Sequence, residues 1–285
     1  MTGRLFICGT PIGNLGDASH RLLRVLGEVD VVAAEDTRRT RKLLTHYGIH
    51  ARLVSHHGAD ERAGAQRLLE RLRRGDRVAL VSDSGMPGVS DPGYEIVRRC
   101  IEEAIPVEAV PGPSAVVTAL CLSGLPMARF AFEGFLPRRD GERRRRLEAL
   151  SCDDRTLVIF EAPGRLPETL AAIEEVLGDR RLALARELTK VHEEVIRGTV
   201  SEVLAGIEDR ELKGEIVLVV EGRCRGAGNL EAALRNARAL REAGQSPSRA
   251  AAAAAATFRV PRRAVYQALL DGSVEGPSPD EISPA

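Results

Sequence analysis

The chain has 285 residues, of which 44% are hydrophobic and 29% charged, and its formal net charge at pH 7 is zero. This length exceeds that of a typical single domain, so we expect two domains and a small appendage. Because the sequence contains no 18-residue apolar run, no signal-peptide pattern and no clustered cysteines, we expect a soluble, cytoplasmic protein without a membrane partner, a disulfide framework or a metal site.

The first 112 residues alternate short apolar segments with segments of helical periodicity. Apolar strands separated by helices are typical of a parallel sheet that is covered on both faces. We therefore predict an N-terminal α/β domain over residues 1–112. Its strands are expected at residues 5–8, 29–34, 52–55, 78–81 and 107–110, and its helices at 18–26, 38–47, 61–74 and 92–104.

A second α/β domain is predicted over residues 113–225, after the Pro-Gly-Pro sequence at 111–113. Its strands are rich in β-branched residues and have hairpin-like spacing, which indicates a mixed sheet. The strands are expected at residues 130–135, 156–160, 182–186, 194–197 and 216–220, and the helices at 114–122, 142–150, 167–177 and 200–207.

A small helical appendage is predicted over residues 229–275, after a glycine-rich hinge at 222–229. Two expected helices, 248–257 and 261–270, flank a short turn and resemble a helix-turn-helix. The alanines at 250–256 favour a helix for reasons unrelated to binding, so a packed helical hairpin is the alternative. The proline-rich end, residues 276–285, is predicted to be disordered.

Residues 82–93, SDSGMPGVSDPG, carry the strongest sign of a binding site. They follow a predicted strand and contain three glycines, two prolines and three serines, more than a plain strand-to-helix connection needs. Glycines let the backbone approach a ligand closely, and N–H groups at a helix start hold polar groups. We expect Asp91 to cap the next helix and Pro92 to be its first residue. The alternative is an elaborate surface loop.

A second glycine-rich loop, residues 9–16, follows the first predicted strand. Its spacing, G-x-x-x-G-x-x-G with an internal proline, differs from the dinucleotide fingerprint, and the chain has no P-loop sequence. NAD and ATP sites of the usual kinds are therefore not expected. Since ligands of open α/β sheets bind at the carboxyl ends of strands, the two loops are expected to contribute to one site.

All but three of the 41 basic residues are arginines, and they concentrate in particular segments. The cations of residues 38–42 either face a phosphate-rich substrate or lie on a solvated helix whose start Glu35 and Asp36 cap. Six arginines within residues 138–146 favour a polyanionic partner. Residues 186–194 mix acidic, basic and hydroxyl groups and fit a substrate-binding wall. An arginine-rich chain is, however, also what a GC-rich genome produces.

Seven motifs occur in an order that resembles one family. They are GTPIGNL at 9–15, AEDTR at 34–38, the 82–93 loop, VPGPSA at 110–115, SGLP at 123–126, FEGFLP at 132–137 and RELTKVHEE at 186–194. Together they cover about residues 4–222 and resemble the bacterial ribosomal RNA small subunit methyltransferase I family, a branch of the tetrapyrrole methylase superfamily.

This resemblance implies methyl transfer from S-adenosylmethionine to the ribose 2′-hydroxyl of a cytidine in 16S ribosomal RNA. It also implies two α/β domains with the cofactor cleft between them, a homodimer, and 16S rRNA or the small ribosomal subunit as partner. By motif, the implied cofactor-binding residues are Pro11, Asp83, Ser84, Gly85, Met86, Val89, Ser114, Ala115, Glu161 and Leu188.

The chain departs from the family pattern at two places. Ser84 and Met86 stand where the family loop usually has alanine and threonine, but the glycine and proline frame is intact. After the strand at 156–160, the sequence EAPGR replaces the usual ESPHR, so a catalytic role for the missing serine and histidine is not expected here.

Methyl transfer from a sulfonium is a direct displacement, which needs alignment of the attacking oxygen and removal of its proton. From their loop positions and the family motifs, the candidates for catalysis are Asp36, Arg38, Glu187 and Lys190.

Two other functions stay open at this point. A small-molecule (tetrapyrrole) methylase would carry a Gly-Gly-Asp-Pro loop and no arginine run, unlike this chain. A non-catalytic RNA-binding assembly factor would use the helical appendage and would not bind S-adenosylmethionine.

Overall fold

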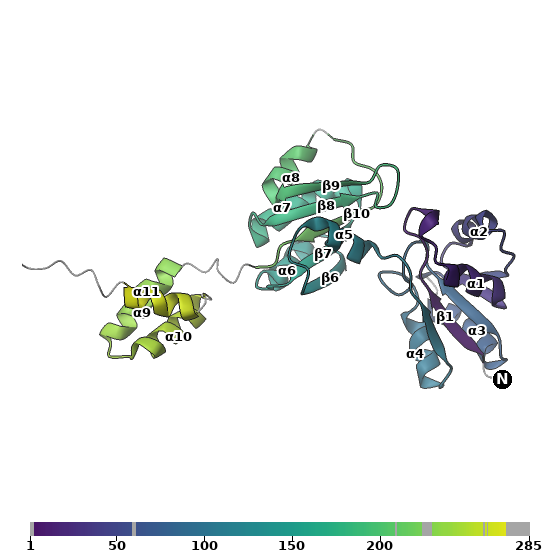
Figure 1. Ribbon diagram of the computed structural model, residues 1–285, viewed down its shortest axis with the longest axis horizontal. Helices are drawn as coiled ribbons and strands as arrows, with labels where there is room; N and C mark the ends of the chain where they lie inside the picture. Colours follow the sequence, from purple (N-terminus) through teal and green to yellow (C-terminus); the bar gives the residue numbers. More distant parts are fainter. Residues whose placement is uncertain are drawn as a thin grey trace, which may run out of the picture. The chain divides into compact units, whose positions relative to one another are not determined.

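The computed structural model describes residues 3–58, 61–208, 210–223, 230–258, 260 and 262–271 (Figure 1). The chain forms two compact units, Met1–Ser151 with Thr156–Glu221, and Cys152–Arg155 with Gly222–Ala285. The first unit contains both sheets. Within the described ranges, none of the helices combines the length and the apolar character that crossing a bilayer requires.

The first sheet has five strands in the order β3-β2-β4-β1-β5, and every pairing in it is parallel. The central strands are apolar and buried on both faces, which explains why the sequence shows continuous hydrophobic runs here. The predicted parallel sheet is confirmed. Its strands are β1 (Arg4–Cys8), β2 (Val31–Ala34), β3 (Leu53–Ser55), β4 (Arg77–Val81) and β5 (Val107–Val110).

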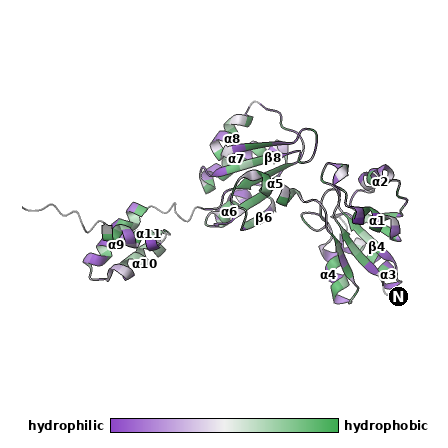
Figure 2. Ribbon diagram, viewed as in Figure 1, coloured by the Kyte–Doolittle hydropathy of each residue, from purple (hydrophilic) through white to green (hydrophobic). Residues whose placement is uncertain are grey.

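Helices cover both faces of this sheet. Because successive side chains of a strand point to opposite faces, Phe6 packs in one core with α1 and α2, whereas Leu5 packs in the other with α3 and α4. In Figure 2, β4 is hydrophobic, whereas α3 also carries hydrophilic residues. These helices are α1 (His20–Glu28), α2 (Thr37–His46), α3 (Glu61–Arg73) and α4 (Tyr94–Glu102), and a short 3-10 turn, η1 (Leu15–Asp17), precedes α1.

Helix α4 begins at Tyr94, after Gly93, and so starts two residues later than predicted. The expectation that Asp91 caps this helix is wrong. Glu61 of α3 serves the helix start instead, because its Oε1 accepts N–H bonds from Gly93 at 2.9 Å and from Glu95 at 3.3 Å. The Asp91 side chain is therefore left for the cavity described below.

The second sheet has the order β6-β7-β10-β8-β9. β6 and β7 are parallel, and the other three pairings are antiparallel, so the predicted mixed sheet is confirmed. Its strands are β6 (Phe130–Phe135), β7 (Thr156–Glu161), β8 (Arg181–Arg186), β9 (Glu194–Thr199) and β10 (Ile216–Val220).

The faces of the second sheet have different partners. One face packs against α6, α7 and α8. The other packs against α5, and Ile12 from the first glycine-rich loop joins that core. The loop at 9–16 is thus anchored on the second sheet while it follows a strand of the first. The helices are α5 (Ala115–Ser123), α6 (Asp140–Leu150), α7 (Leu166–Leu177) and α8 (Val200–Ile207), with a 3-10 turn, η3 (Pro163–Arg165), before α7.

The chain passes from the first sheet to the second between β5 and α5, close to the predicted boundary at residue 112. Both sheets nevertheless belong to one compact unit, and the division into separate domains stays a prediction.

The C-terminal unit contains three helices with a small core of their own, which includes Ala233, Ala251 and Val265. The two helices expected around a short turn are present, and a further helix precedes them. They are α9 (Leu230–Glu242), α10 (Pro247–Phe258) and α11 (Arg262–Asp271). Most of the predicted hinge, residues 224–229, and the predicted tail, residues 276–285, lie outside the described residues.

Candidate functional site

A cavity of about 330 Å³ gathers residues from both sheets of the first unit. It is bordered by the loop after β4, the start of α5, the ends of β6 and β7, and the segment that leads into β10. Its lining residues are Ser84, Gly85, Met86, Val89, Ser90, Asp91, Ser114, Ala115, Val116, Phe135, Phe160, Glu161, Ala162, Pro163, Gly214, Glu215, Ile216 and Val217.

Seven of the ten predicted cofactor-binding residues line this cavity, although they come from three distant parts of the sequence. Phe135 and Phe160 form an apolar part of the lining, and their rings are in edge-to-face contact with centroids 5.6 Å apart. The seven residues are Ser84, Gly85, Met86, Val89, Ser114, Ala115 and Glu161.

Close backbone packing holds the loops around the cavity together. Thr10 and Gly85 form an isolated antiparallel bridge, with N–H···O distances of 2.9 Å and 3.2 Å. A Cβ atom on Gly9 would lie 2.6 Å from the Met86 sulfur and 2.7 Å from the backbone of Gly112, so Gly9 admits no side chain. Met86, which stands where the family loop usually has threonine, therefore fills the space beside Gly9. Gly9 and Gly112 permit this close packing because they carry no side chains.

Asp91 is the polar residue of the cavity that the sequence reasoning misplaced. Burial, and next the negative charge of Glu35, raise the pKa of its carboxyl group to about 6, while a hydrogen bond with Ser82 acts in the opposite direction. Asp83 and Glu215 add smaller contributions of the same sign as Glu35. The length of the 82–93 loop was a signal for this position of Asp91. The loop is longer than a connection from a strand to a helix needs, so its last residues need not belong to the helix.

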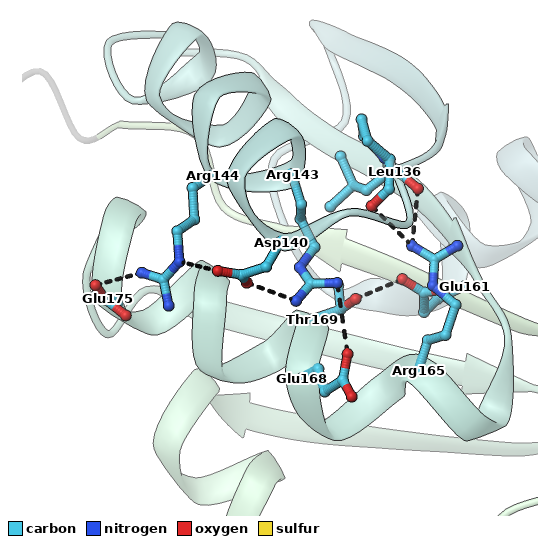
Figure 3. A network of polar contacts seen from close by, with 10 residues as sticks. Leu136, Asp140, Arg143, Arg144, Glu161, Arg165, Glu168, Thr169 and Glu175 are labelled. Atoms are coloured by element: carbon cyan, nitrogen blue, oxygen red, sulfur yellow. Dashed lines mark hydrogen bonds and ion pairs between the residues drawn. The ribbon is translucent and has the colours of Figure 1, made fainter.

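Glu161, the last residue of β7, is an acidic residue that lines the cavity. Its side chain is buried, and its Oε2 accepts a 2.6 Å hydrogen bond from the Thr169 hydroxyl. Its Oε1 accepts the Ala162 N–H at 2.8 Å and lies 3.4 Å from Nε of Arg165 (Figure 3). These contacts fix the orientation of the carboxylate.

Pro11, Asp83 and Leu188 do not line the cavity, and their contact with a cofactor stays a prediction. The Asp83 carboxylate accepts the Asp36 N–H at 2.9 Å and so joins the 82–93 loop to the start of α2. Leu188 is buried in the core that contains Ile12. Both residues support the loops around the cavity.

The four predicted catalytic residues form two separate pairs. Asp36 and Arg38 are joined at 2.7 Å, and Arg38 holds the pKa of the Asp36 carboxyl well below its usual range. Lys190 lies 2.8 Å from Glu187 and 3.4 Å from Glu215, which lines the cavity. Among the described residues, no hydrogen bond or ion pair joins one pair to the other.

The charges of these pairs make them poor proton acceptors. Burial lowers the pKa of Lys190, but its bonds with Glu187 and Glu215 outweigh burial and raise it overall. The pKa of Glu187 is lowered, first by its hydrogen bond with Lys190. Lys190 is therefore protonated at neutral pH, and Glu187 is a weak base.

Strained backbone surrounds the same region. Glu187 and Thr189 have φ angles of 48° and 66°, and Ser90, which lines the cavity, has 63°. In the described part of the chain only one other residue that is not glycine, Ala104, has a positive φ. Such strain persists where the surrounding structure enforces it and is concentrated at functional sites.

Three arginines of the run at 138–146 form ion pairs with nearby acids. Arg143 is 3% exposed and lies 2.8 Å from Asp140, and Arg144 bridges Asp140 and Glu175 (Figure 3). Arg146 pairs with Glu133. The helix dipole and the run of like charges are compensated by acids on α6, α7 and β6, and a polyanionic partner for this run stays a prediction.

Comparison with known proteins gives one consistent family. The family model described as Tetrapyrrole (Corrin/Porphyrin) Methylases matches residues 4–204. A ribosomal RNA small subunit methyltransferase I of Thermotoga maritima is 48% identical over 78% of this chain and 99% of its own length. The corresponding protein of Escherichia coli O157:H7 is 45% identical over 94% of this chain and 95% of its own length.

Solved structures agree on the fold. A uroporphyrin-III C-methyltransferase from Thermus thermophilus is 26% identical, covers 78% of this chain and 93% of its own, and has a TM-score of 0.53. A second structure of such an enzyme from the same organism, complexed with S-adenosylhomocysteine, is 23% identical with a TM-score of 0.56, and the aligned part covers 77% of this chain and 97% of that one.

Proposed function

Because the chain belongs to the tetrapyrrole methylase family, and within it to the ribosomal RNA small subunit methyltransferase I proteins, we propose that it methylates 16S ribosomal RNA with S-adenosylmethionine. The modified atom in this proposal is the ribose 2′-oxygen of a cytidine. The observation that carries the proposal is the cavity, which gathers seven of the predicted cofactor-binding residues in one place.

The residues of the cavity fit S-adenosylmethionine. Met86, Val89 and Phe160 provide apolar surface for the adenine ring, and the acids Glu161 and Glu215 provide negative charge for a sulfonium and an ammonium group. The close packing of Gly9 against Gly112 holds the loops near a ligand without intervening side chains. When bound, S-adenosylmethionine supplies an electrophilic methyl group.

Asp91 takes the proton of the ribose hydroxyl in this proposal. A carboxylate is a useful base when its pKa lies near the working pH, and burial together with Glu35 raises the pKa of Asp91 to about 6. The carboxylate is thus ionised at neutral pH but more basic than an exposed aspartate. Asp36, Arg38, Glu187 and Lys190 orient the substrate and balance charge at the rim, since their own bonds hold them in ionised forms.

Binding of S-adenosylmethionine to the purified protein tests the proposed function. We expect isothermal titration calorimetry to show one donor molecule per chain, and competition by S-adenosylhomocysteine. The matched comparison is adenosine triphosphate, which shares the adenosine part and should not bind, because the chain lacks a phosphate-binding glycine loop of the usual kind. Absence of donor binding would favour the non-catalytic assembly factor.

The homodimer implied by the family is also part of the proposal. It is supported by exposed apolar side chains on and after α5, where Val117 is 50%, Met127 49% and Phe130 39% exposed. Phe130 lies on β6, an edge strand of its sheet. We expect sedimentation at twice the chain mass, and a shift toward the monomer in a Val117→Asp variant. Sedimentation of the unaltered protein as a monomer would contradict the dimer.

A further inference from the structure

The outer face of α2 carries two neighbouring cations that no acid neutralises. Arg41 and Lys42 are exposed, and neither takes part in an ion pair within the described ranges of the chain. In the 138–146 run, acids neutralise Arg143 and Arg144 (Figure 3). Arg146 is paired as well, whereas Arg138 and Arg145 are exposed and have no ion pair in the part of the chain that the structure describes. Exposed cations that no acid neutralises are available to an anionic partner.

Helix packing fixes the orientation of this face. Leu43 and Leu44 of α2 are buried in the core of the first sheet, so the opposite side of the helix points to solvent. Five residues at helical spacing line one shallow hollow there, and they are defined here as the α2 basic face. They are Arg38, Arg41, Lys42, Thr45 and His46. The spacing from the first to the last corresponds to about 12 Å along the helix axis.

The α2 basic face begins at the candidate active site. The Asp36 N–H donates to the Asp83 carboxylate at 2.9 Å, and Nε of Arg39 lies 3.5 Å from the same side chain. Asp83 belongs to the 82–93 loop, and the next residue of that loop, Ser84, lines the cavity. The helix therefore starts at the loop that borders the cavity, and its cationic face continues away from that loop.

We infer that the α2 basic face binds the phosphate backbone of the RNA substrate next to the nucleotide that enters the cavity. This inference rests on the proposed function and adds the surface that positions the RNA. Arginine forks, a lysine ammonium, a threonine hydroxyl and a histidine ring are groups that contact phosphate oxygens, and no carboxylate lines the hollow. Phosphate contacts set register and carry no sequence information, so the cytidine is selected elsewhere.

The test removes the two unpaired charges together, in the variant Arg41→Gln with Lys42→Gln. Glutamine keeps helix propensity, and both positions are exposed, so the fold is preserved. The matched control is Arg138→Gln with Arg145→Gln, two exposed cations of the segment that the sequence alone favoured. Binding is measured at several salt concentrations with unmodified 16S rRNA and with small subunits that lack the methylation, using the probe that the unaltered protein binds more tightly.

We expect the α2 variant to bind RNA at least tenfold more weakly near 0.1 M salt, with a slope of log K against log salt that is shallower by about 1.4. The control should stay within about twofold. The inference is overturned if the α2 variant binds like the unaltered protein, if the control loses as much, or if the unaltered protein binds neither probe. Titration of S-adenosylmethionine into each protein distinguishes a failure of this inference from a failure of the proposed function. If the unaltered protein does not bind S-adenosylmethionine, the proposed function itself is contradicted.

Discussion

Replacing Asp91 with asparagine is expected to lower kcat for methyl transfer by about 10²- to 10⁴-fold, the usual contribution of a general base. Asparagine has nearly the same shape as aspartate but cannot accept the proton of the ribose hydroxyl. If Asp91 acts as the base, single-turnover methylation slows while the dissociation constant for S-adenosylmethionine stays within a few-fold. Equal rates in the two proteins would contradict this role, and a loss confined to donor affinity would assign Asp91 to donor binding instead.

The pH dependence follows from the same carboxyl group. Its pKa is raised from 3.8 to about 6, chiefly by burial and next by Glu35, so the base form is lost as the pH falls through 6. We expect kcat/KM of the unaltered enzyme to rise with pH up to this value and then level off. The asparagine variant should lack this limb. Asp17→Asn, which alters an exposed acid outside the cavity, is the control and should keep it.

Stability measurements keep a loss of activity from being mistaken for unfolding. A raised pKa in the folded state means that ionisation of Asp91 costs stability as the pH rises from about 4 to 6, and the cost persists above 6. At pH 7.5 the Asp91→Asn variant should therefore have a Tm at least as high as that of the unaltered protein. The advantage should shrink as the pH falls toward 4 and disappear below about pH 3, where the carboxyl group is neutral in both states.

Gly112→Ala is expected to weaken S-adenosylmethionine binding by more than tenfold, on the order of 1.4 kcal/mol or more. The new Cβ would lie 2.5 Å from the Gly9 carbonyl oxygen and 2.9 Å from its Cα, which are backbone atoms that cannot rotate away. The loop at 9–16 must then separate from the segment that leads into Ser114. Because that separation distorts the cavity, donor affinity should fall together with thermal stability.

Gly27→Ala provides the matched control for this substitution. Gly27 lies in α1, and a Cβ there meets no atom within 4 Å. Alanine at this position should stabilise the protein slightly, by about 0.5–1 kcal/mol, and leave donor binding unchanged. Calorimetric titration and thermal melts of both variants make the comparison. Normal donor affinity in Gly112→Ala would show that the cavity does not depend on the contact between the two loops.

The parallel sheet could be predicted because its physical cause is local. Segments such as 78–81 are apolar at every position, as strands buried on both faces must be, and glycines follow several of the helices between them. The mixed second sheet followed from β-branched composition in the same way. In the C-terminal unit, the alanine-rich α10 was predicted from its composition, whereas α9 was not, although the periodic pattern of α9 is the stronger of the two.

The site could be predicted in part, and what was missed depended on long-range contacts. Seven predicted cofactor-binding residues were found through motifs, and the cavity gathers them: Ser84, Gly85, Met86, Val89, Ser114, Ala115 and Glu161. Asp91 was misassigned because a local rule favours Asp-Pro as a helix start, whereas Glu61 from another helix caps α4. The ion pairs of the arginine run have the same origin: the acids that neutralise Arg144, for example, include Glu175 on a different helix.

Protonation states also escaped sequence reasoning. Asp36 and Asp91 are the same residue type in strand-end loops, but Arg38 lowers the pKa of one, and burial raises the pKa of the other to about 6. Only the fold decides which aspartate is the better base. The family motifs pointed to the region, and the structure distinguishes the groups within it.

Mass spectrometric mapping of 16S rRNA tests the central claim most directly. RNA or small subunits from a strain that lacks the enzyme are incubated with the purified protein and S-adenosylmethionine, and the RNA is digested and sequenced by mass. The account predicts one new methyl group on the ribose 2′-oxygen of a cytidine, which is absent when the Asp91→Asn protein is used. A methyl group on a base, or no methylation of either substrate by a protein that binds the donor, would contradict it.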